Sequence, residues 1–136
     1  MGLTYEEFEL GAIYDTQPRT ITEADVVNFA GLSGDFNPIH TDVEAAKNGP
    51  FGERIAHGML TVAISTGMAN MTGLMAGTTI ALLEQNIKYT GAVKFGDTVR
   101  LQMEVIDKRE TSKPDRGIVK LAARVLNQRD ELVVDM

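Results

Sequence analysis

One stretch decides the fold of this 136-residue chain: His57-Gly-Met-Leu-Thr-Val-Ala-Ile-Ser-Thr-Gly-Met-Ala-Asn-Met71. Apolar and small residues occupy every side of the helix that it would form, which is typical of a helix buried in a protein interior. Gly58 stands at its start, and Gly73 follows its end, where glycine often terminates a helix. We therefore predict a central, buried helix from Met59 to Met71.

After this helix, the hydrophobic pattern changes to the alternation that is typical of β-strands. Residues 78–90, 98–108 and 118–127 are rich in β-branched residues, and a last strand begins at Leu132. The chain end at Met136 cuts this last strand short, so we expect the chain to be either naturally short or truncated. A buried helix followed by antiparallel strands predicts an α+β fold, in which the sheet wraps around the helix.

The residues before the helix form a less regular segment. We expect a short strand near residues 13–20, then a helix that Thr22-Glu-Ala-Asp25 opens with a capping hydroxyl and an acid three residues later. A second short helix is expected at 41–47. We interpret residues 21–56 as an overhang outside the sheet, within a single domain that spans residues 1–136.

The bulk composition excludes several classes of protein. The net charge of −6 argues against a general nucleic-acid binder, and no apolar run is long enough to insert across a membrane. The chain has no cysteine, which excludes disulfides and thiolate metal sites and fits a reducing compartment. We therefore expect a cytoplasmic protein.

The overhang carries the clearest chemistry, in the stretch Ser33-Gly-Asp-Phe-Asn-Pro-Ile-His40. Asp35 and His40, which we call the dyad, flank Asn37-Pro38, a dipeptide that favours a turn and blocks a regular helix. An Asp and a His that converge on one water molecule make a workable acid/base pair near neutral pH. Each residue alone also has a structural explanation, as a turn residue or as a histidine with satisfied hydrogen bonds. His40 and His57 lack the spacing of known metal sites, so we predict no metal.

Two motifs in the sequence resemble the signature of a known family. They are Asp35-Phe-Asn-Pro-Ile-His40 and Ile55-Ala-His-Gly-Met-Leu60, and together they resemble the MaoC-like acyl dehydratases, also called (R)-specific enoyl-CoA hydratases. Phe95-Gly-Asp-Thr-Val99 and Lys113-Pro-Asp-Arg-Gly117 are similar to further features of that family. The resemblance implies the hot-dog fold, a curled antiparallel sheet around one long helix, assembled as a homodimer or a dimer of dimers.

The resemblance also implies an activity, that of a hydro-lyase. The expected reaction is (R)-specific hydration of 2-enoyl-CoA to (3R)-3-hydroxyacyl-CoA and the reverse dehydration, with the acyl-CoA thioester as substrate and no cofactor. By this resemblance Asp35 and His40 hold and activate one water, and the backbone N–H of Gly58 binds the thioester oxygen as charge develops on it. The alternatives are a 3-hydroxyacyl-acyl-carrier-protein dehydratase of fatty-acid elongation and a non-catalytic acyl-CoA-binding subunit.

Gly58 and its neighbours also have structural interpretations. A glycine at a helix start is explained as well by close packing as by an oxyanion site. We expect His57 to orient the loop through a hydrogen bond and Asn37 to fix the turn. One of Ser65 and Thr66 would bond to the dyad, unless both hydroxyls bond to their own helix backbone.

Overall fold

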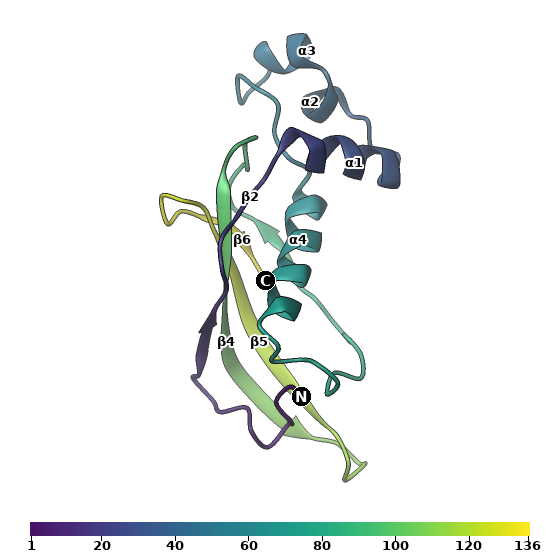
Figure 1. Ribbon diagram of the computed structural model, residues 1–136, viewed down its shortest axis with the longest axis vertical. Helices are drawn as coiled ribbons and strands as arrows, with labels where there is room; N and C mark the ends of the chain where they lie inside the picture. The colour runs from purple at the N-terminus through teal and green to yellow at the C-terminus, as the bar shows by residue number, and fades with distance from the viewer.

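The chain, described over all residues 1–136 by a computed structural model, forms one antiparallel sheet with a long helix against one face (Figure 1). The strands are β1 (Ile13–Asp15), β2 (Arg19–Thr20), β3 (Lys88–Tyr89), β4 (Thr98–Glu110), β5 (Gly117–Leu126) and β6 (Leu132–Asp135). Their order is β1-β4-β5-β6-β3, and β2 also pairs with β4. The strand predicted over residues 13–20 is split into β1 and β2 around Pro18, which has no N–H to donate to a neighbouring strand.

Four helices complete the fold: α1 (Glu23–Ser33), α2 (Pro38–Thr41), α3 (Val43–Lys47) and α4 (Gly58–Met71). Helix α4 lies against the sheet, whereas α1, α2 and α3 lie together beyond one end of it (Figure 1). The predicted α+β class and the predicted long helix are thus confirmed. None of the helices combines the length and the apolar character needed to cross a membrane.

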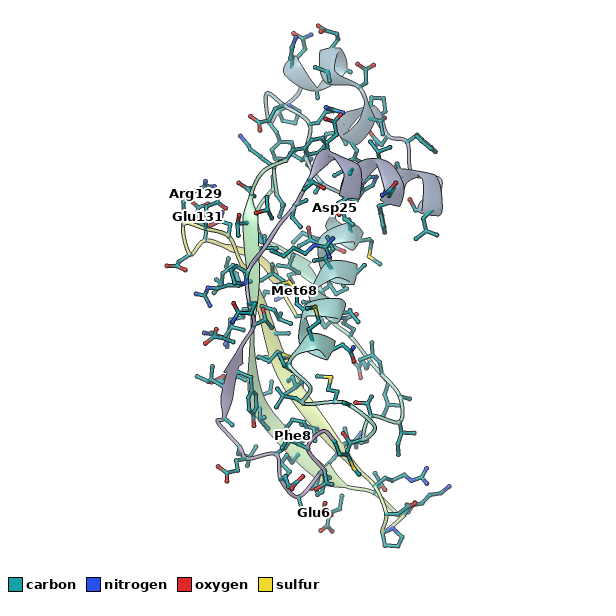
Figure 2. All side chains as sticks on the ribbon, viewed as in Figure 1. Glu6, Phe8, Asp25, Met68, Arg129 and Glu131 are labelled. Carbon is teal, nitrogen blue, oxygen red and sulfur yellow. The ribbon has the colours of Figure 1, made fainter.

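The hydrophobic core lies between α4 and the sheet. Alternate residues of β4 point into it, and Val99, Leu101 and Met103 are each at most 2% exposed. Leu60 and Met68 of α4 belong to the same buried cluster, with Met68 lying between the helix and the sheet (Figure 2). The strand alternation read from the sequence therefore gives the correct inward face.

The overhang begins as the sequence predicts. The Thr22 hydroxyl accepts a hydrogen bond from the N–H of Asp25 at 3.1 Å, and the Asp25 carboxylate accepts one from the N–H of Thr22 at 2.9 Å. This reciprocal pair caps α1. Gly34 ends the helix with a left-handed φ of 79°, a conformation that glycine adopts without a steric penalty.

The prediction that Asn37-Pro38 blocks a helix is wrong. Pro38 is the first residue of α2, and Asn37 caps it by accepting a hydrogen bond from the N–H of Ile39 at 3.1 Å. Proline suits this position because its missing N–H would have no partner within the helix. The overhang therefore contains three helices rather than two.

The prediction of a strand over residues 78–90 is wrong for most of its length. Only Lys88–Tyr89 pairs with a neighbour, β6, and residues 80–87 make no backbone hydrogen bond within the chain. Ile80, Leu82 and Leu83 in this segment are 69–75% exposed. Alternating β-branched residues show that a segment can form a strand, but pairing needs a neighbour that the single chain does not provide.

The expectation that α4 is buried on all sides is also wrong. Met59 at its start is 57% exposed, and Ala63, Gly67 and Asn70 lie on the same exposed stripe. A sheet on one side can cover only the face of the helix that it contacts. The exposed stripe and residues 80–87 together form what we call the open face.

Candidate active site

Asp35 lies in the turn between α1 and α2 and is held by its immediate neighbours. Its N–H donates to the Ser33 hydroxyl, and one of its carboxylate oxygens accepts from the N–H of Asn37, each at 3.1 Å. This closes an Asx turn. The other carboxylate oxygen makes no hydrogen bond to the protein and is available to a bound molecule.

His40 lies in α2, and its ring is oriented by a backbone carbonyl. Its Nδ1 lies 2.7 Å from the carbonyl oxygen of Ile55. A carbonyl oxygen can only accept, so Nδ1 carries a proton, and in the neutral ring the lone pair is then on Nε2. The role of Ile55 could not be predicted from the sequence, because its side chain takes no part in the contact.

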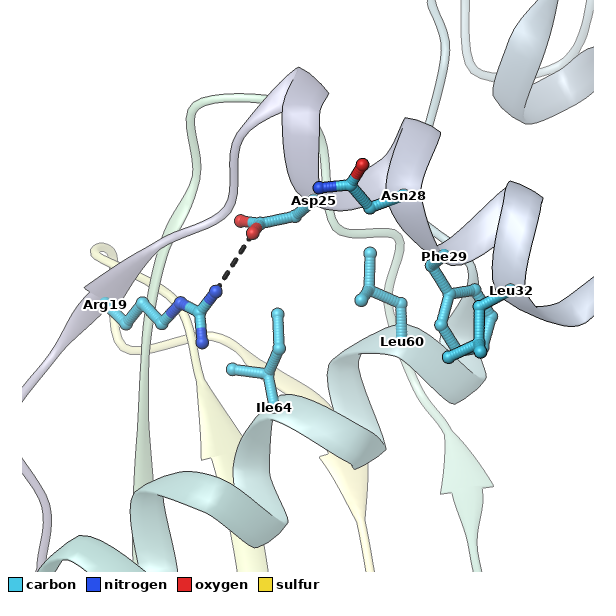
Figure 3. A pocket seen from close by; sticks show the side chains of 7 residues that line it. All are labelled: Arg19, Asp25, Asn28, Phe29, Leu32, Leu60 and Ile64. Atoms are coloured by element: carbon cyan, nitrogen blue, oxygen red, sulfur yellow. Dashed lines mark hydrogen bonds and ion pairs between the residues drawn. The ribbon is translucent and has the colours of Figure 1, made fainter.

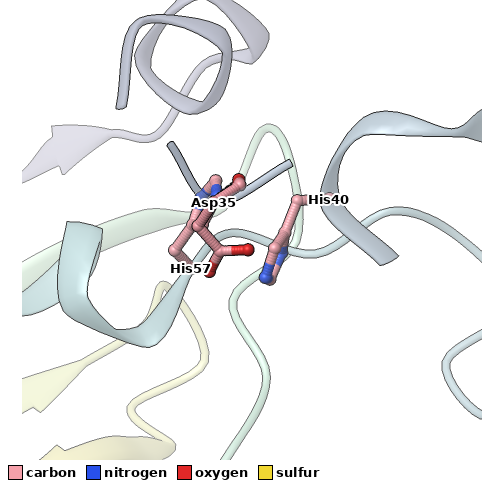
Figure 4. A group of neighbouring side chains, drawn as sticks. All are labelled: Asp35, His40 and His57. Atoms are coloured by element: carbon pink, nitrogen blue, oxygen red, sulfur yellow. Dashed lines mark hydrogen bonds between the residues drawn. The ribbon is translucent and has the colours of Figure 1, made fainter. Parts of the chain in front are cut away.

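The two members of the dyad lie close enough to share one water molecule. A carboxylate oxygen of Asp35 and ring nitrogens of His40 and His57 all lie within 4.8 Å of one another (Figure 4). A water that makes two hydrogen bonds of about 2.8 Å spans such a separation. The structure thus brings together the two residues that the sequence singled out.

His57 lies beneath this pair and contacts both of its members. Its Nε2 lies 2.9 Å from the carbonyl oxygen of Asp35, and its ring stacks on that of His40 with centroids 3.8 Å apart. Phe29 of α1 packs edge-on against the His57 ring at 4.9 Å. The hydrogen bond that we expected from His57 is therefore present, whereas the two ring contacts were not predicted.

The closeness of these three side chains also raises the question of a metal site. The lone pair of a ring nitrogen lies in the ring plane, and the planes of His40 and His57 differ by only 26°. Stacked rings direct their nitrogens side by side rather than toward one ion. The arrangement suits a water held by hydrogen bonds better than a coordinated metal, and the absence of a metal remains a prediction.

Gly58 is the first residue of α4, where a backbone N–H has no partner within the helix. A Cβ atom at this position would lie 2.5 Å from a ring carbon of Tyr89, so close packing favours glycine here unless the Tyr89 ring moves. The Tyr89 hydroxyl donates to the sulfur of Met59 at 3.2 Å. The structural interpretation of Gly58 is thus supported, and it leaves the N–H available to a substrate. The place of Tyr89 beside the site had no signal in the sequence.

Ser65 and Thr66 are occupied within their own helix. Both hydroxyls donate to the carbonyl of Val62, at 2.7 Å from Ser65 and 3.2 Å from Thr66. The structure therefore shows no hydrogen bond from either residue to the dyad. Asn37, as the cap of α2, fixes the turn that carries Asp35.

A hollow of about 220 Å³ lies next to this group of residues, between α1 and α4 (Figure 3). Its lining consists of Arg19, Asp25, Asn28, Phe29, Leu32, Leu60 and Ile64. Arg19 and Asp25 form an ion pair of 2.9 Å across it. Burial raises the pKa of the Asp25 carboxyl, but hydrogen bonds from Thr22 and the charge of Arg19 outweigh this and hold the pKa below its ordinary value. Phe29 separates the hollow from His57.

Comparison with known proteins places this arrangement in a family. The pattern of the family described as MaoC like domain matches residues 7–125. The chain is 32% identical to a 3-hydroxybutyryl-CoA dehydratase of Methylorubrum extorquens over 98% of this chain and 80% of that protein. It is 34% identical to an (R)-specific enoyl-CoA hydratase of Aeromonas caviae over 82% and 78% of the two chains. The crystal structure of a MaoC-like dehydratase from Rhodospirillum rubrum superimposes with a TM-score of 0.90 at 30% identity, covering 98% of this chain and 92% of that one.

The fold and the named relatives define a hydro-lyase with a hot-dog fold. Within that class, the chain belongs to the MaoC-like dehydratase family.

Proposed function

We propose that the protein catalyses (R)-specific hydration of 2-enoyl-CoA to (3R)-3-hydroxyacyl-CoA and the reverse dehydration. The observation that supports this most strongly is the Asp35 carboxylate within 4.8 Å of a His40 nitrogen, next to the start of α4. The names of the two relatives, a CoA dehydratase and an (R)-specific enoyl-CoA hydratase, support the same reaction.

In the proposed reaction, one water is held between the free Asp35 oxygen and Nε2 of His40. Its oxygen bonds to C3 of the enoyl group while one member of the dyad takes a proton from it. The pair delivers a proton to C2, so that water is added across the double bond and the dyad returns to its starting state. Negative charge develops on the thioester oxygen during this step, and the N–H of Gly58 at the positive end of α4 would stabilise it.

Crotonyl-CoA provides the direct test. The conjugated double bond absorbs in the ultraviolet, so hydration appears as a loss of absorbance, and chiral analysis identifies the product. We expect the (3R)-hydroxy product. An (S) product, or no hydration of crotonyl-CoA or of longer enoyl-CoA thioesters, would contradict the proposal.

Two alternatives concern what the site accepts. The dyad acts on the acyl part, which is the same on CoA and on acyl carrier protein, so a 3-hydroxyacyl-acyl-carrier-protein dehydratase uses the same chemistry. Comparing kcat/KM for one acyl chain on the two carriers separates these cases. A non-catalytic acyl-CoA-binding subunit has no need of Asp35 and His40 together, and it would bind crotonyl-CoA without turnover.

We propose further that the protein works as a homodimer built on the open face. Residues 80–87 leave their backbone groups unpaired, and Leu82 and Leu83 expose more than 70% of their surface. An unpaired strand edge with apolar side chains is a template for a second strand. Closed two-fold symmetry would pair this edge with the same edge of a second copy and cover the exposed stripe of α4.

Light scattering coupled to size-exclusion chromatography tests the dimer, and it also detects a dimer of dimers. We expect a mass twice that of the 14.8 kDa chain, or four times for the larger assembly. Leu82→Asp should yield a monomer, because it places a charge on the paired edge, whereas Glu110→Ala on the distal hairpin should not. A wild-type monomer would contradict the proposal.

Two further expectations stay as predictions. Activity that survives dialysis against a chelator would support the absence of a metal or other cofactor. Cell fractionation would test the cytoplasmic location.

A further inference from the structure

The side chain of His57 contacts both members of the dyad. It meets Asp35 through a hydrogen bond of 2.9 Å to the backbone carbonyl, and it meets His40 through ring stacking at 3.8 Å. Only 2% of His57 is exposed, so solvent does not compete for these contacts. Asp35 lies in an exposed turn whose side-chain hydrogen bonds are local, and His40 is half-buried and held by the carbonyl of Ile55. A buried ring that contacts both residues is therefore the feature best placed to fix their separation.

The contacts of the two histidines define opposite tautomers. His40 donates through Nδ1 to Ile55, whereas His57 donates through Nε2 to Asp35. A cationic ring would also donate through Nε2, but its Nδ1–H would then be buried without an acceptor, which is costly. A neutral ring beneath His40 leaves His40 free to take a proton, since two stacked cations would repel each other.

The Nδ1 atom of His57 is buried and has no hydrogen-bond partner. One other buried side-chain atom shares this property, Oγ1 of Thr61. The backbone N–H of Thr61 donates to the carbonyl of His57 at 3.3 Å, so Thr61 lies one helical turn from His57. The Thr61 hydroxyl is a donor of the kind that an unprotonated Nδ1 requires, either directly or through one buried water.

We propose that His57, kept as the neutral Nε2–H tautomer by Thr61, is a positioning residue that fixes Asp35 and His40 relative to each other. This role rests on the proposed hydratase function. The positioning role requires both the N–H donor and the ring of His57, because the donor holds Asp35 and the ring holds His40.

A pair of substitutions separates these two contributions. His57→Gln keeps a donor amide and loses the ring, and His57→Phe keeps a ring and loses the donor. We expect each to lower kcat for crotonyl-CoA about tenfold or more, with KM within about twofold, because misplaced catalytic groups slow turnover more than they weaken binding. Thr61→Val should lower kcat less than either His57 variant does. Thr72→Val, which removes a hydroxyl bonded to the backbone at the far end of α4, should not change it.

Nitrogen NMR of the wild-type chain labelled at histidine tests the tautomer without an assay. We expect a protonated Nε2 and an unprotonated Nδ1 for His57 at neutral pH, and loss of this single form in Thr61→Val. A protonated Nδ1 or a cationic His57 would overturn the proposal, as would wild-type kcat in both His57 variants. If the wild-type chain hydrates no enoyl thioester, the proposed function fails, and the NMR result still decides the state of His57. If the His57 variants do not fold, the wild-type spectrum remains decisive.

Discussion

The core between α4 and the sheet and the overhang of residues 21–56 are held together in different ways. In the core, side chains such as Leu101 and Met103 are almost fully buried, and the strands pair over long stretches. In the overhang, most of the surface is exposed, and the helices depend on caps such as Thr22 and Asn37. The proposed acid/base groups, Asp35 and His40, lie in the second region. Their positions are therefore set by a few individual hydrogen bonds, whereas the stability of the chain is set elsewhere.

The largest expected effect follows from removing the dyad. Asp35→Asn and His40→Gln should each lower kcat about 100- to 10,000-fold, the usual contribution of an acid/base group. Neither side chain is buried in the core, so thermal unfolding should stay close to that of the wild type. Kinetics with crotonyl-CoA and a thermal melt measure the two quantities. Glu44→Gln, an exposed change in the same overhang, is the control, and near-normal turnover in either dyad variant would refute the assignment.

In the core we expect the opposite pattern, a loss of stability without a loss of turnover. Leu101→Ala should lower the free energy of unfolding by about 2–5 kcal/mol, because it removes buried apolar surface and leaves a cavity. Urea denaturation measures this change. The fraction that remains folded should turn over at the wild-type rate. A fall in kcat in fully folded Leu101→Ala would show that the two regions are more tightly coupled than the contacts indicate.

Gly58 lies where the two regions meet, and both kinds of effect should appear there. Gly58→Ala forces a Cβ against the Tyr89 ring, and such overpacking costs about 1–3 kcal/mol of stability. The double variant Gly58→Ala with Tyr89→Ala removes the clash and should regain most of the stability. If Gly58 also lets the thioester approach α4, the turnover of the double variant should stay below that of Tyr89→Ala alone. Equal turnover in these two variants would show that Gly58 serves only close packing.

The smallest effect concerns the start of the overhang. Asp25→Ala removes the capping box of α1 and the ion pair with Arg19, and it should cost about 1 kcal/mol of stability. The pKa of Asp25 is lowered in the folded chain, so its contribution is complete above the unfolded pKa of about 3.9 and is lost as the pH falls through the folded value. The stability difference between wild type and Asp25→Ala should therefore shrink in acid. A difference that does not change with pH would contradict this account.

Local signals account for much that the sequence predicted correctly. The capping box at Thr22 and the alternation along β4 act over a few residues, so a sequence pattern contains all the information needed. The wrong predictions concern features that depend on a partner distant in the sequence or outside the chain. Residues 80–87 have the composition of a strand but no neighbour in the single chain, and α4 is covered on only one face.

The sequence by itself singled out the candidate catalytic residues, because Asp35, His40 and Gly58 stand in two short motifs that resemble a family signature. It also determined the order of helix and strands, since periodicity is a local property. Only the tertiary structure decided how the site is held. The carbonyl of Ile55 that orients His40, the ring of His57 stacked beneath it and Tyr89 against Gly58 all come from parts of the chain that meet through folding. Contacts between such distant segments depend on the packing of the whole chain, and no spacing in the sequence encodes them.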